Sequence, residues 1–168
     1  MNSLVRTAVA SYAQIRPGWR ITYRSESEGL KALADAELIL LALSQLLNHA
    51  CDWSEPGSEV AVRVGEEGGT ISVRVSSPGN AIPAYLGDRI FDRTYAGTLV
   101  PGLAMGGGGG LYVARKIAMA HGGTIDSTRD GAEPGGVTLQ LSLPRAETLV
   151  NQEITAQRAA DPDGQGLR

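Results

Sequence analysis

Hydrophobic residues recur at helical spacing in three segments of the chain, residues 3–14, 35–49 and 110–121. In the second segment they form one continuous stripe on a helix, made of Ile39, Ala42, Leu43, Leu46, Leu47 and Ala50. Asp35 precedes that stripe and is of a type favoured at helix N-termini. The third segment stops at Gly122, a residue typical of helix ends. The pattern therefore predicts three helices, and the second has the clearest signal.

Apolar and polar residues alternate in four other segments, as they do in half-buried strands, and residues 124–130 precede the fourth of them as its expected hairpin partner. The five predicted strand segments are residues 19–24, 60–64, 71–75, 124–130 and 136–144. Gly68 and Gly69 separate the second from the third and indicate a hairpin, and the last two form another. Helices and hairpins in this order predict an α+β fold, a two-layer α/β sandwich. Its sheet is expected to be mixed but mostly antiparallel, with the helices packed on one face.

The periodic segments define one domain over residues 1–145. Inside it, residues 76–107 read as a long irregular region with a short helical turn near "YLGDRIF" (85–91). Periodicity is lost from Arg145 onward, and residues 146–168 are expected to form a disordered tail.

Composition narrows the class of protein. The chain has 168 residues, 42% of them hydrophobic, which suits one globular domain. Its net charge of −3 is spread along the chain without a basic cluster, so nucleic acid is not an expected partner. No apolar run is long enough to span a bilayer, and we expect a cytoplasmic location without membrane insertion, including the case of a cytosolic part of a membrane-bound sensor. Cys51 is the single cysteine, which excludes a disulfide framework within the chain.

A run of five glycines, residues 106–110, leads directly into the third predicted helix. Polyglycine is commonly a flexible linker. A glycine loop before a helix N-terminus can instead bind phosphate, because its backbone N–H groups and the helix dipole face the anion.

Three stretches together resemble the ATP-binding domain shared by gyrase, the heat-shock chaperones, the mismatch-repair ATPases and the sensor histidine kinases. "LLALSQLLNHACDWS" (40–54) resembles the asparagine box, "VRVSSPGNAIP" (73–83) the first glycine box, and "GGGGGLYVARKIAMAHGGTI" (106–125) the second. "RIFDRTY" (89–95) is similar to the phenylalanine box. Within the family, the chain looks like the catalytic, ATP-binding domain of a sensor histidine kinase, a GHKL domain with the Bergerat fold. The resemblance implies ATP and Mg²⁺ as cofactors.

The first glycine box departs from the family pattern. The pattern has an aspartate that accepts a hydrogen bond from the adenine amino group, and Ser77 occupies that position. Gly79 follows as expected, but Ala81 replaces the next glycine. Losing a charge-assisted hydrogen bond costs about 1.5–3 kcal/mol, so weaker adenine binding is expected.

The long predicted helix, residues 35–49, also departs from the family pattern. Its register places Gln45 and His49 at the family's two polar ligand positions, and Asn48 about 100° away around the helix. Gln45 is the candidate catalytic side chain, and His49 or Asn48 the candidate metal ligand. A histidine offers nitrogen, whereas Mg²⁺ prefers oxygen. Asp52 falls where the kinases often carry lysine, and a carboxylate there would repel the phosphates.

The second glycine box matches the pattern at Gly106, Gly108 and Gly110, and Leu111 follows as expected. The extra glycines increase the backbone entropy that is lost when this loop becomes ordered around a ligand. The other histidine of the chain, His121, ends the third helix, and we assign it no chemistry.

Three hypotheses follow. The favoured one is a degenerate kinase domain, a pseudokinase with weakened or lost ATP binding that acts through protein contacts. The first alternative is an active domain that transfers the ATP γ-phosphate to a histidine on a separate dimerisation domain, using substitute pocket residues. The second is a binding module for a different small ligand. The expected partners are a dimerisation and phosphoacceptor domain, of the same parent or of a partner kinase, and a response regulator.

Overall fold

The computed structural model describes residues 1–79, 87–93, 109–128, 136–148 and 150. Five strands form one sheet in the order β1-β2-β3-β5-β4. The strands are β1 (Arg20–Ser25), β2 (Glu59–Glu67), β3 (Thr70–Ser77), β4 (Thr124–Thr128) and β5 (Val137–Pro144). β1 runs parallel to β2, and every other neighbouring pair is antiparallel. The predicted mixed, mostly antiparallel sheet is confirmed.

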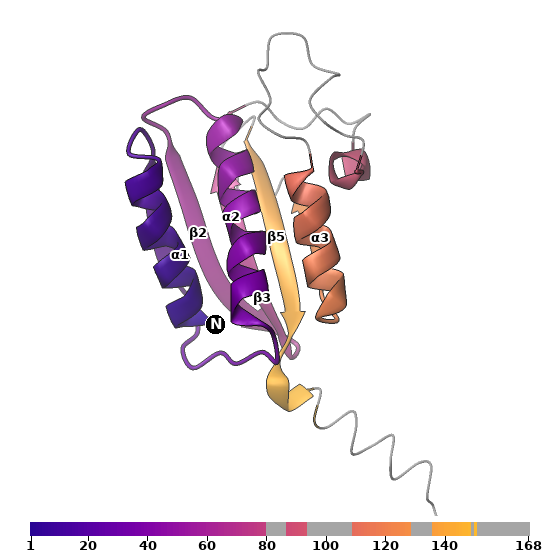
Figure 1. The fold of residues 1–168 in the computed structure, drawn as a ribbon. Coiled ribbons are helices and arrows are strands. Elements are labelled where there is room, and N and C mark those ends of the chain that lie inside the picture. Colours follow the sequence, from indigo (N-terminus) through magenta and orange to yellow (C-terminus); the bar gives the residue numbers. More distant parts are fainter. Residues whose placement is uncertain (80–86, 94–108, 129–135, 149, 151–168) are drawn as a thin grey trace, which may run out of the picture.

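The helices cover one face of this sheet (Figure 1). They are α1 (Asn2–Ile15), α2 (Ala36–Asp52) and α3 (Gly110–Ala120), with the short 3-10 helix η1 (Gly87–Phe91) beside α3. α2 lies between the other two helices and crosses the middle of the sheet. The predicted two-layer α+β sandwich is therefore confirmed.

The core lies between α2 and the central strands. Alternate residues of β2 and β3 point toward the helices and are buried: Val60, Val62, Val64, Ile71, Val73 and Val75. The apolar stripe of α2 meets them and is buried along its length. The apolar stripe of α2 and the inward-facing residues of β2 and β3 are buried against each other. This burial stabilises the fold by about 25 cal/mol per Å² of apolar surface and holds α2 on the sheet.

Asp35 caps α2 as its position predicted. Its Oδ1 accepts hydrogen bonds from the backbone N–H groups of Glu37 and Leu38, at 2.9 and 3.1 Å. The Asp35 backbone N–H donates to Nε2 of His121, at 3.1 Å, so the end of α3 is joined to the beginning of α2. α2 ends three residues later than predicted, at Asp52, because Ala50 and Cys51 still pack in the core.

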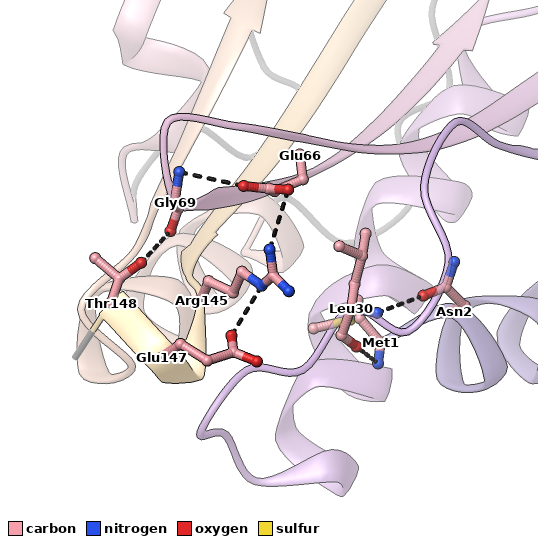
Figure 2. A network of polar contacts seen from close by, with 8 residues as sticks. All are labelled: Met1, Asn2, Leu30, Glu66, Gly69, Arg145, Glu147 and Thr148. Carbon is pink, nitrogen blue, oxygen red and sulfur yellow. Dashed lines mark hydrogen bonds and ion pairs between the residues drawn. The ribbon is translucent and has the colours of Figure 1, made fainter. Parts of the chain in front are cut away.

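The chain beyond β5 continues as a short helical turn rather than leaving the domain at residue 145 (Figure 2). Arg145 forms ion pairs with Glu66 at 3.3 Å and with Glu147 at 2.8 Å. Thr148 Oγ1 donates to the Gly69 carbonyl at 3.2 Å. This turn therefore packs on the β2–β3 hairpin, and except for Val150 the rest of the expected tail lies outside the described residues.

The segment between β1 and α2 is held against the start of α1 (Figure 2). The amino group of Met1 donates to the Leu30 carbonyl at 2.6 Å, and the Leu30 N–H donates to Asn2 Oδ1 at 3.2 Å. Leu30 itself is 2% exposed. These contacts fix the path by which the chain enters α2, the helix that carries the candidate residues Gln45, Asn48, His49 and Asp52.

Candidate functional site

Two pairs of polar residues, each spaced by four, point in different directions from the last turns of α2. Asn48 and Asp52 face Arg16, the residue that follows α1. Arg16 Nη2 donates to Asn48 Oδ1 at 3.2 Å and to Asp52 Oδ1 at 3.0 Å. The Asp52 charge is therefore paired with a guanidinium on the α1 side of the helix. The Asn48 oxygen, a candidate metal ligand in the sequence, already accepts a hydrogen bond.

Gln45 faces the first turn of α3. A Cβ atom on Gly110 would lie 2.3 Å from Gln45 Oε1 and 3.2 Å from its Cδ. The beginning of α3 therefore approaches Gln45 of α2 closely, and a Cβ at position 110 would require the flexible Gln45 amide to shift. Leu111 is 6% exposed and belongs to the core. The other predicted phosphate-loop glycines, Gly106 and Gly108, lie outside the described residues.

His49 is the most unusual side chain at this end of α2. Its ring stacks on Trp53, with the centroids 4.8 Å apart and the planes at 15°. Some of the residue is accessible, but both ring nitrogens are buried and have no hydrogen-bond partner in the described part of the chain. This burial lowers the pKa of His49 to about 4, so the imidazole is neutral at pH 7.

The residues at the end of β3 meet the end of α2 at Trp53. Ser77 is 2% exposed, and its buried hydroxyl has no partner among the described residues. Gly79 has φ +142°, and a Cβ there would lie 2.2 Å from the Trp53 carbonyl oxygen. Only glycine allows this contact, which brings the first glycine box against the asparagine box. Ala81, the next predicted position, is outside the described residues.

Sequence reasoning missed Trp53. The residue is 4% exposed, stacks on His49 through its ring, and contacts Gly79 through its carbonyl oxygen. Its indole Nε1 is buried without a partner in the described structure. A tryptophan directly after the long helix was the available signal, but its position alone did not indicate contact with a glycine 26 residues later.

The donor set at this site does not fit Mg²⁺ well. Of the candidate site residues on α2, those not engaged by Arg16 are Gln45, which offers one amide oxygen, and His49, which offers nitrogen. Within the described ranges, no three His, Cys, Asp or Glu residues gather in a way that could hold a metal ion. The polar atoms of Gln45 and His49 are neutral, and the described residues of the site do not form the oxygen-rich set that the family pattern implies.

The second histidine has a structural environment. His121 Nδ1 lies 2.7 Å from the Ile117 carbonyl, and its Nε2 accepts from the Asp35 N–H. Its two ring nitrogens therefore join the end of α3 to the cap of α2.

Of the described helices, none has the length and apolar character needed to cross a membrane.

The turn predicted near residues 85–91 is present as η1. Its residues Ile90 and Phe91 are each 2% exposed and pack in the core. The Arg115 guanidinium of α3 lies 5.2 Å from the centre of the Phe91 ring. The segment that resembles the phenylalanine box therefore packs against α3 beside the glycine-rich end of that helix.

Residues 34–147 match the family described as histidine kinase-, DNA gyrase B-, and HSP90-like ATPases. The chain is 28% identical over 166 residues to the sensor-like histidine kinase SenX3 of Mycobacterium tuberculosis, covering 97% of this chain and 40% of the relative. It is 31% identical over 119 residues to the histidine-protein kinase/phosphatase MprB of Mycolicibacterium smegmatis, covering 69% of this chain and 24% of the relative. The chain thus spans less than half the length of these relatives.

Solved structures of kinase domains share the fold. The nucleotide-free catalytic domain of histidine kinase ThkA superimposes with a TM-score of 0.72 at 22% identity, covering 86% of this chain and 93% of that domain. ThkA in complex with the response regulator protein TrrA matches with a TM-score of 0.72 at 20% identity, covering 88% of this chain and 41% of ThkA. The family match, the relatives and the arrangement of the boxes around α2 agree, and the chain belongs to the family of histidine kinase-, DNA gyrase B-, and HSP90-like ATPases, with the fold of a sensor histidine kinase catalytic domain.

Proposed function

We propose that this domain serves a two-component sensor kinase, that its affinity for ATP and Mg²⁺ is weakened or lost, and that it acts through contacts with other proteins. The observation that carries the proposal is His49. The sequence register predicts that it stands at the metal-ligand position of the family pattern, and its neutral imidazole, with both nitrogens buried, stacks on Trp53. Nitrogen is a poor ligand for Mg²⁺, so the metal that accompanies the triphosphate would lose its partner on α2.

Two further features support weak nucleotide binding. Ser77 places a neutral hydroxyl where the family pattern has a carboxylate. Asp52 stands where the kinases often carry lysine, so an acid replaces the cation that would balance phosphate charge, and the nearby Arg16 guanidinium is paired with this carboxylate. Each replacement removes a charged contact to the nucleotide, and hydrogen bonds to charged groups contribute about 1.5–3 kcal/mol each.

The expected partners are a dimerisation and phosphoacceptor domain, of the same parent or of a partner kinase, and a response regulator. The curated relatives are named as sensor kinases, and ThkA was solved with its response regulator protein. Within this chain, the His49 nitrogens are buried and those of His121 contact backbone groups. A phosphoacceptor histidine is therefore expected outside these residues.

The alternative is an active kinase domain with substitute ligands. It is favoured by the polar atoms that remain buried and unpartnered in the described structure, Ser77 Oγ and Trp53 Nε1. An unpaired buried donor or acceptor costs about 1–3 kcal/mol, and a bound nucleotide could satisfy both. Gln45 would then supply the metal with an amide oxygen.

Calorimetric titration of ATP with Mg²⁺ into the full chain distinguishes a domain with weakened or lost ATP binding from an active kinase domain. We expect no measurable heat from the natural chain, and binding by the His49→Asn/Ser77→Asp variant, which restores an oxygen ligand and a carboxylate. Ser72→Asp is the matched control, because it adds the same charge to the same strand on the face turned away from the helices. His49→Asn alone is the fallback if the carboxylate at position 77 prevents folding.

Binding by the natural chain at about 10 µM or tighter, near 7 kcal/mol, contradicts the proposal and supports the active kinase. Equal gains in ATP affinity from His49→Asn/Ser77→Asp and from Ser72→Asp would also contradict it, because the gain would then not depend on a carboxylate at the adenine position.

A further inference from the structure

Three arginines stand side by side on the sheet face opposite the helices. Strand register pairs Arg24 of β1 with Arg63 of β2, and Arg63 with Arg74 of β3. The neighbours of these residues along each strand point toward the core, as Val62, Val64, Val73 and Val75 do, so the three arginines share the outer face. We call these three residues the arginine row.

The arginine row lacks carboxylate partners in the described part of the chain. Arg24 and Arg63 are exposed and form no ion pair there, and Arg74 donates to the neutral Gln140 amide at 2.8 Å. Like charges directly opposite each other on neighbouring strands destabilise a sheet. Sheet stability therefore does not explain the row.

A neighbouring position on the same face shows the usual arrangement. Arg20 of β1 is paired in register with Glu59 of β2, and the two form an ion pair that Thr22 also joins through its hydroxyl. Four residues further along each strand, on the same face, the position opposite Arg24 is Arg63 instead of an acid.

We propose that the arginine row binds an acidic patch on a partner protein. Guanidinium groups pair with carboxylates through two parallel hydrogen bonds, which gives geometric specificity as well as attraction. Neighbouring strands lie about 4.8 Å apart, so the row extends roughly 10 Å across β1, β2 and β3. Glutamates at positions i, i+4 and i+7 of a helix extend over a similar length, at about 1.5 Å per residue.

Acidic groups beside the row and beyond its β3 end favour a short acidic patch over a long polyanion such as nucleic acid. Beside the row, the Glu26 carboxylate reaches over β2, with Oε2 2.9 Å from the position of a Cβ on Gly65, two residues after Arg63. Beyond the β3 end, Asp126 of β4 is in register with Gln140, the residue next to Arg74. A phosphate backbone that extended past the row along the strands or across β5 would meet these carboxylates, whereas three carboxylates aligned with the row itself would not extend over them. The proposal does not depend on whether the nucleotide pocket is active.

A peptide probe tests this surface on the full chain. The probe is a fluorescent alanine-based helical peptide with glutamates at i, i+4 and i+7, compared with the same peptide carrying glutamines, by anisotropy at low salt. We expect the glutamate peptide to bind about tenfold tighter, and this preference to disappear when Arg24, Arg63 and Arg74 are replaced by glutamine. Salt should weaken the interaction, because the Debye length falls from about 30 Å at 0.01 M to about 10 Å at 0.1 M.

The matched control replaces three exposed cations of the helical layer by glutamine, namely Arg6, Arg89 and Lys116. It removes the same net charge and should keep the preference. Equal binding of the two peptides overturns the proposal, and so does an equal loss in the control variant. Tighter binding of a single-stranded DNA oligomer than of the glutamate peptide also overturns it, in favour of a polyanion.

Discussion

Acidification from about pH 7 to about pH 4.5 is expected to destabilise the fold through His49. The ordinary histidine pKa of 6.5 applies to the unfolded chain, while burial lowers the pKa of His49 to about 4 in the fold. Between these values the unfolded chain binds a proton that the folded chain excludes. The stability is therefore fully present above about pH 6.5 and is lost as the pH falls toward 4.

The magnitude follows from the two pKa values. One pKa unit corresponds to about 1.36 kcal/mol, so the shift from 6.5 to about 4 gives a full effect of about 3.4 kcal/mol, and about 2.5 kcal/mol of it is lost by pH 4.5. The source of the effect is local: both ring nitrogens are buried without a partner in the described structure, so the charged form would lose its hydration and gain no acceptor.

Urea unfolding followed by circular dichroism, at a series of pH values, measures this term in the natural chain and in His49→Asn. The variant loses the stacking on Trp53 and will differ at neutral pH, so the informative quantity is the change with pH. Carboxylates titrate in both proteins and cancel in the difference. Parallel curves for the two proteins between pH 7 and 4.5 would refute the reasoning, since they would mean that His49 takes up a proton equally in both states.

Other substitutions test the local geometry. Asp35→Ala should cost about 1 kcal/mol of unfolding free energy in urea, because two N–H groups at the start of α2 lose their acceptor. Gly79→Ala should lower the melting temperature far more than Gly57→Ala, although both glycines have positive φ, because only the Cβ at 79 meets the Trp53 carbonyl oxygen; equal losses would contradict this account. Cys51 should not react with a thiol reagent at pH 8 until the chain unfolds, because burial raises its thiol pKa to about 11, and rapid reaction of the folded chain would count against the buried position.

Local patterns predicted much of this architecture because they depend on residues close in the sequence. The stripe on α2 and the alternation in β2 and β3 gave the elements and their buried faces, and Asp35 gave the helix start. The short boxes gave the family, which the match over residues 34–147 confirms. Helical periodicity also separated Gln45 and His49 from Asn48 before any contact was known.

The contacts of the site could not be predicted in the same way. Arg16 reaches Asn48 and Asp52 across more than thirty residues, and Gly79 meets Trp53 only because β3 ends beneath the last turn of α2. Neither contact produces a periodic pattern in the sequence, since each depends on how two elements pack. The roles expected for Gln45, His49 and Ser77 toward a nucleotide stay predictions.

The sequence by itself determined the elements, the α+β class and the family, because hydrophobic periodicity and short motifs are properties of neighbouring residues. Only the tertiary structure decided which polar groups are neutralised, which are buried without partners, and which charges share a surface. The arginine row illustrates the difference: three arginines that lie between 11 and 50 residues apart become neighbours through strand register alone. Register is set by burial of the opposite face across the whole sheet, which no single segment encodes.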